Sequence, residues 1–122
     1  MQTRRAPIDP RHLADFAALI RVLAHPVRLR LVELLADRGR TVSSLQQALG
    51  ERQAIVSQQL ARLRAAGVVS CRREGTSVWY TLADPRVLSV LDCLRNCENS
   101  AARRRLRRAT RFEESRWTAS RS

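Results

Sequence analysis

The sequence predicts a mainly helical α+β domain in which several helices precede a single β-hairpin and one more helix follows it. Three observations support this fold class: Asp or His before Pro at helix starts, apolar residues at helical spacing, and one alternating apolar run beside a glycine-containing turn. The 122 residues suffice for one domain with a modest core. We expect an N-terminal arm over 1–9, the domain over 10–99, and an Arg-rich tail or helix extension over 100–122.

Two helices are predicted in the first third of the chain. Asp9 and Pro10 form a cap-and-proline start, and apolar residues follow at helical spacing: Leu13, Phe16, Ala17, Ile20 and Leu23. Pro26 ends this helix and starts the second one, with His25 in place of the usual capping residue. The second helix is expected to run to about Asp37.

The next segment has the pattern of a helix-turn-helix. Ser43 or Ser44 is expected to cap a short third helix that ends at Leu49. Gly50 then marks a tight connection to a fourth helix over 53–66. Two helices joined by three or four residues around a glycine define this motif.

The fourth helix has one apolar side, formed by Val56, Leu60 and Leu63. The opposite side is polar without being highly charged. Such a helix fits the DNA major groove, where Gln pairs with adenine and Arg with guanine. We expect this side to contact base edges or their surroundings through Gln53, Ala54, Ser57, Gln58 and Arg62.

A hairpin follows the predicted recognition helix. Residues 68–73 and 77–82 read as strands around a turn at 74–76. Arg72 and Arg73 are expected at its tip, on phosphates or in the minor groove. A hairpin in this position is the wing of a winged helix-turn-helix.

A fifth helix is predicted from Asp84 and Pro85, with Val87, Val90, Leu91 and Leu94 on one stripe.

Composition favours a polyanionic partner. The formal charge is +12, from 23 basic residues, all Arg, against 11 acidic ones. No apolar run approaches the roughly 20 residues that cross a bilayer, and the first ten residues lack a signal-peptide core, so we expect a cytoplasmic protein with no membrane partner. Three cysteines in such a chain predict reduced thiols.

Several stretches resemble the ArsR/SmtB family of bacterial repressors: HPVRLRL at 25–31, VSQQLARLRAAGVV at 56–69, RREG at 72–75 and WYTL at 79–82. The resemblance covers roughly residues 12–97. It implies a homodimeric repressor whose first and last helices form the dimer interface, and whose ligand or redox state alters its affinity for double-stranded operator DNA. Two-fold symmetry then predicts an operator that is an imperfect inverted repeat.

The chain departs from the sensing sites of several such relatives. The start of the third helix offers no thiol, and the second helix has no cysteine. The only histidines are His12 and His25, which excludes imidazole ligands on the last helix.

Cys93 and Cys97 therefore stand out as a candidate sensor. Residues four apart on a helix face the same way, so two soft thiolates can share one ion. The candidate inducers are As(III), Sb(III), Cd(II), Pb(II), Cu(I) and Zn(II), and Cys71 or a thiol of a second subunit would supply a third sulfur. Two alternatives remain open: the same cysteines respond to thiol oxidation or persulfide, or they only pack.

An enzyme is not expected. The sequence shows no phosphate-binding glycine loop, no metal-binding pair of histidines and no nucleophile elbow. The remaining alternative function is protein binding through the winged helix. Such a protein would bind DNA weakly, and its affinity for DNA would not depend on salt.

Overall fold

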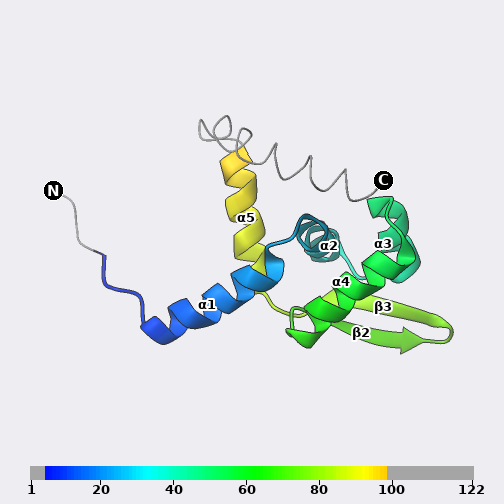
Figure 1. Cartoon of the computed structure of the whole chain (residues 1–122), viewed down its shortest axis with the longest axis horizontal. Helices are drawn as coiled ribbons and strands as arrows, with labels where there is room; N and C mark the ends of the chain where they lie inside the picture. Colours follow the sequence, from blue (N-terminus) through cyan, green and yellow to red (C-terminus); the bar gives the residue numbers. More distant parts are fainter. Residues whose placement is uncertain (1–4, 99–122) are drawn as a thin grey trace.

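The computed structural model describes residues 5–98, which form five helices and three strands (Figure 1). The helices and the hairpin follow in the predicted order, and one short strand was not predicted. The helices are α1 Pro10–Leu23, α2 Pro26–Asp37, α3 Val42–Leu49, α4 Gln53–Ala65 and α5 Arg86–Glu98. The strands are β1 Arg40–Thr41, β2 Val69–Glu74 and β3 Ser77–Leu82. The predicted Arg-rich segment over 100–122 lies outside the described residues.

Local capping sets the helix starts. The Asp9 carboxylate accepts a hydrogen bond from the Arg11 backbone N–H at 2.8 Å. His25 caps α2 through Nδ1, which accepts from the Val27 N–H at 3.1 Å, as its position before Pro26 predicted. The predicted cap of α3, Ser43 or Ser44, was wrong. The cap is Thr41, whose hydroxyl accepts a hydrogen bond from the Ser44 N–H at 3.2 Å.

The three strands form an antiparallel sheet in the order β1-β3-β2. The sequence did not indicate β1, because two residues are too short to show alternation. Arg72 and Arg73 pair with Trp79 and Val78 within the ladder. These arginines therefore lie just before the turn and not at its tip, where Gly75 has a positive φ of 61°.

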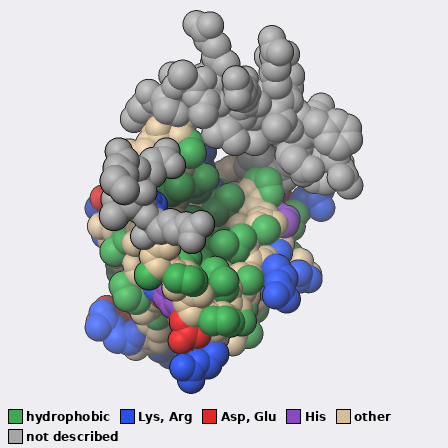
Figure 2. Space-filling model, turned by 90° about the vertical axis from the view of Figure 1, so that its left-hand side faces the viewer, with side chains coloured by type: hydrophobic (Ala, Val, Ile, Leu, Met, Phe, Trp, Pro, Cys, Tyr) green, Lys and Arg blue, Asp and Glu red, His purple; other side chains and the backbone are tan. Residues whose placement is uncertain are grey.

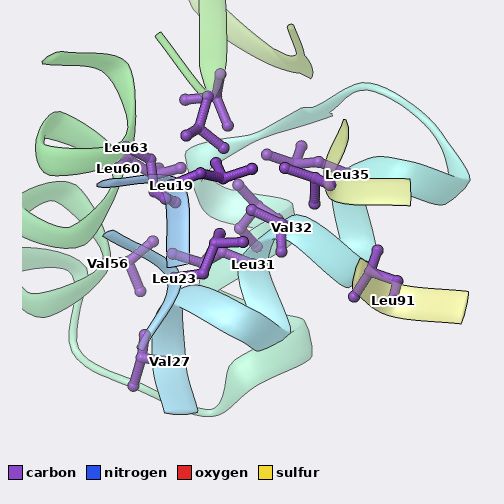
Figure 3. Packing of buried hydrophobic residues seen from close by; sticks show 14 residues of the cluster. Leu19, Leu23, Val27, Leu31, Val32, Leu35, Val56, Leu60, Leu63 and Leu91 are labelled. Atoms are coloured by element: carbon purple, nitrogen blue, oxygen red, sulfur yellow. The ribbon is translucent and has the colours of Figure 1, made fainter. Parts of the chain in front are cut away.

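The core is built from every helix and the base of the hairpin. Leu31 of α2, Leu45 of α3 and Leu60 of α4 have no exposed surface. They pack in one cluster with Leu19 and Leu91, which come from α1 and α5 (Figure 3). This cluster fixes which side of α4 faces outward.

The helices α1 and α5 extend away from the remainder of the fold (Figure 1). Where they meet, the Arg86 guanidinium lies over the Phe16 ring at 6.0 Å. Among the described residues, none of the helices has the length and apolar character that crossing a membrane requires.

Candidate nucleic-acid interface

The predicted reading residues share one solvent-facing side of α4. Val56, Leu60 and Leu63 are completely buried on the opposite side. The exposed positions include all five that the sequence singled out: Gln53, Ala54, Ser57, Gln58 and Arg62. Arg64 is also exposed and lies two turns beyond Ser57 on this side. Arg64 was not among the residues predicted from the sequence, although the helical period alone places it on this side.

The turn before α4 depends on Gly50. This residue has φ 66°, a left-handed conformation that glycine adopts without a steric penalty, and its N–H donates to the Gln46 carbonyl at 2.9 Å. The neighbouring Glu51 is buried, and its carboxylate accepts from the Arg52 N–H at 3.3 Å. The connection therefore holds α3 and α4 in the packed arrangement of a helix-turn-helix.

The wing presents two arginines with different electrostatic surroundings. Arg72 forms an exposed ion pair with Glu74 at 3.0 Å. Arg73 is exposed and takes part in no ion pair within residues 5–98. The hydroxyls of Ser70 and Thr81 meet at 3.0 Å across the two strands and brace the hairpin. Arg73 thus offers the less neutralised charge to an anionic partner.

A group of basic side chains lies where the start of α2 packs against α4. Burial lowers the pKa of His25, and the charges of Arg28 and Arg62 lower it further. Burial and the charge of Arg62 also lower the pKa of Arg28. Nothing in the sequence groups these residues, because Arg62 is remote from the other two along the chain.

The cysteines of α5 lie along a shallow hollow that Ser89, Asp92 and Asn96 also line. Cys93 is exposed and Cys97 is half-buried. Cys71 lies on β2, opposite Tyr80. Residues 5–98 contain no group of three or more His, Cys, Asp or Glu side chains that could hold a metal ion.

A glycine turn between two packed helices, an exposed polar helix face and an arginine-bearing hairpin define a winged helix-turn-helix DNA-binding domain. A family model described as "Helix-turn-helix domain" matches residues 23–72.

Named relatives and a solved structure extend this match. The chain is 38% identical to the biofilm growth-associated repressor of Agrobacterium fabrum over 88 residues, covering 72% of this chain and 75% of the relative. It is 43% identical to the transcriptional repressor SmtB of Mycobacterium tuberculosis over 83 residues, covering 67% of this chain and 62% of the relative. The crystal structure of M. tuberculosis Rv0081 superposes with a TM-score of 0.66 at 35% identity, covering 81% of this chain and 99% of that one. The chain belongs to the ArsR/SmtB family and is a DNA-binding transcriptional regulator, not an enzyme.

Proposed function

We propose that this protein is a homodimeric repressor that binds an imperfect inverted repeat of operator DNA through α4 and the wing. The observation that carries the proposal is the position of Gln53, Ser57 and Gln58 on one exposed side of α4, free of carboxylates. Short polar side chains of this kind reach base edges in the major groove. Arg72 and Arg73 would contact phosphates or the minor groove beside it.

The proposed dimer interface uses α1 and α5. Large hydrophobic side chains are exposed along α1 and just before it, where Ile8, Leu13 and Ile20 are 52–58% exposed. On α5, Leu88 and Leu94 are 45% and 46% exposed. The side of the molecule on which these helices lie is broadly hydrophobic (Figure 2). A second copy of the chain would cover this surface and set the spacing of two α4 helices.

Titration against duplex DNA at several salt concentrations tests the DNA-binding part. Each phosphate neutralised by an arginine contributes about −0.9 to the slope of log affinity against log salt. Arg73→Gln should lower affinity and flatten this slope, whereas Arg95→Gln on α5 removes the same charge away from the wing and should not. A slope near zero for the wild type would overturn the assignment, and protection of one isolated half-site would overturn the inverted repeat.

We propose that the inducer is a thiophilic ion held by Cys93 and Cys97. Their i, i+4 spacing on one helix and their shared hollow support binding of one ion by both sulfurs. Two thiolates alone are enough ligands to coordinate Cu(I). As(III), Sb(III), Cd(II) or Pb(II) would take a further ligand, such as a thiol of the partner subunit. Because α5 belongs to the proposed interface, closure around an ion would change the separation of the two α4 helices and release the operator.

The second candidate is a thiol-redox or persulfide response of the same cysteines. Cβ atoms at i, i+4 are about 5–6 Å apart, whereas a disulfide needs about 3.5–4.5 Å. Oxidation by a peroxide, which takes two electrons from the two thiols as their protons are released, would therefore distort α5 around Cys93 and Cys97.

The double variant Cys93→Ser plus Cys97→Ser separates these possibilities. It should bind the operator like the wild type but fail to release it, since the typical coupling of 1–3 kcal/mol, about 5-fold to 150-fold in affinity, is removed. Cys71→Ser is the matched control, and a reduced response there would identify a third ligand. Operator affinity is measured with each of the candidate ions and, separately, with a peroxide and a persulfide donor. If the double variant still releases DNA, the cysteines only pack.

A further inference from the structure

Three basic side chains lie at the start of α2 and on the helix α4 that packs against it. His25 caps α2, Arg28 lies on the first turn of the same helix, and Arg62 lies on α4, which packs against it. Each of the two arginines acts on the charge of His25, and Arg62 acts on Arg28. Within residues 5–98, no carboxylate forms an ion pair with any of the three. We call this group the basic corner.

The guanidinium of Arg28 is only partly satisfied. One terminal nitrogen donates to the Val22 carbonyl in the last turn of α1 at 2.7 Å. Its Nε is buried and has no hydrogen-bond partner. Arg28 as a whole is half-buried, and a cation with an unmet N–H near a second cation is less stable than a cation beside an anion. The free protein therefore holds at this corner a positive charge that negative charge would stabilise.

The capping role of His25 fixes which proton it can offer. Because Nδ1 accepts the hydrogen bond of the Val27 N–H, the neutral ring carries its proton on Nε2. Nε2–H is thus a donor that does not compete with the cap. An oxyanion that reaches the corner would accept a hydrogen bond from this N–H and be attracted by the two guanidinium charges.

The position of Arg62 indicates which anion this is. Arg62 lies on the exposed side of α4, the side that we place in the major groove, and the groove is bordered by the phosphates of the DNA backbone. We propose that His25, Arg28 and Arg62 bind one backbone phosphate of the operator. This contact rests on the proposed docking of α4. It adds to the DNA interface a part of α2 that is neither in the helix-turn-helix pair nor in the wing.

The test compares Arg28→Gln with the matched control Arg30→Gln. Arg30 is two residues further along α2, is 58% exposed and pairs with Glu33, so its loss removes the same charge outside the corner. Arg28→Gln should weaken binding equally on operator and random DNA. It should also reduce the salt slope of the dimer by about 2, one for each subunit, relative to Arg30→Gln. Equal slopes for the two variants would overturn the phosphate contact and leave Arg28 as a cap of α1.

A second measurement uses the wild type, in case Arg28→Gln does not fold. NMR titration of the His25 ring in free and operator-bound protein should show a higher pKa in the complex, because a phosphate stabilises the imidazolium. His12, on α1, is the internal reference, and an unchanged His25 would overturn the proposal. If the wild type shows no salt-dependent DNA binding, the proposed function fails. If it binds steeply and His25 and Arg28 have no effect, only this inference fails.

Discussion

The His25 side chain both caps α2 and carries a titratable ring, and two substitutions separate these roles. His25→Ala removes the acceptor at 3.1 Å from the Val27 N–H and should lower the free energy of unfolding by about 1 kcal/mol. In a domain of this size that change lowers Tm by about 4–8 °C. His25→Asn keeps a side-chain oxygen acceptor without a titratable ring, so its stability at neutral pH should remain near that of the wild type.

The pH dependence follows from the pKa of His25, which burial and then the charges of Arg28 and Arg62 lower below its ordinary value of 6.5. Between this lowered pKa and 6.5 the unfolded chain binds the proton and the folded chain does not. The contribution of neutral His25 is therefore fully present above pH 6.5 and is lost as pH falls through the lowered pKa. Protonation of Nδ1 also removes the cap.

Thermal unfolding at one fixed protomer concentration, at pH 7.5 and at pH 5.5, measures both the stability lost without the cap and the stability lost as the pH falls. The wild type should lose more stability between these pH values than His25→Asn, which keeps the cap at both. Identical losses in the two proteins would refute the argument that the lowered pKa belongs to His25. An Ala variant as stable as the wild type at pH 7.5 would refute the cap.

Three further predictions concern the reading face, a turn and the dimer. Gln58→Ala should cost about 1–3 kcal/mol on the operator and less on random DNA, measured by fluorescence anisotropy; equal losses would remove Gln58 from base recognition. Gly67→Ala should lower the free energy of unfolding, measured in urea, by about 1–2 kcal/mol. Gly67 has φ 75°, and an added Cβ would meet no atom within 4 Å, so the loss comes from backbone strain and not from a steric clash. Ile20→Glu should yield monomers in sedimentation, since it places a charge on the exposed apolar side of α1; an intact dimer would move the interface elsewhere.

Local signals explain why much of the fold was predictable. A helix start is decided by neighbours within one turn, so Asp9-Pro10 and His25-Pro26 located α1 and α2 correctly. The outward side of α4 followed from the period of its apolar residues. The position of α3 was predicted, but its cap was misassigned to Ser43 or Ser44, because the choice of Thr41 depends on its pairing with Trp79 of β3.

The candidate sites likewise combine features that local sequence decides with features that only folding decides. The sequence alone determined that Cys93 and Cys97 share a helix flank, because four residues nearly complete a turn. Only the folded chain could show that residues 5–98 hold no group of three potential ligands around this pair and that Leu88 and Leu94 are both exposed, since packing between elements sets both.

The sequence by itself determined the helices, the hairpin and the polar side of α4, because each depends on residues within about two turns or one strand pair. The tertiary structure decided that the charge of Arg62 lowers the pKa of Arg28, that the Nε of Arg28 is buried without a partner, and that apolar side chains of α1 are left exposed. Burial and the sum of nearby charges are properties of chain segments brought together in space. They have no period along the sequence from which they can be read.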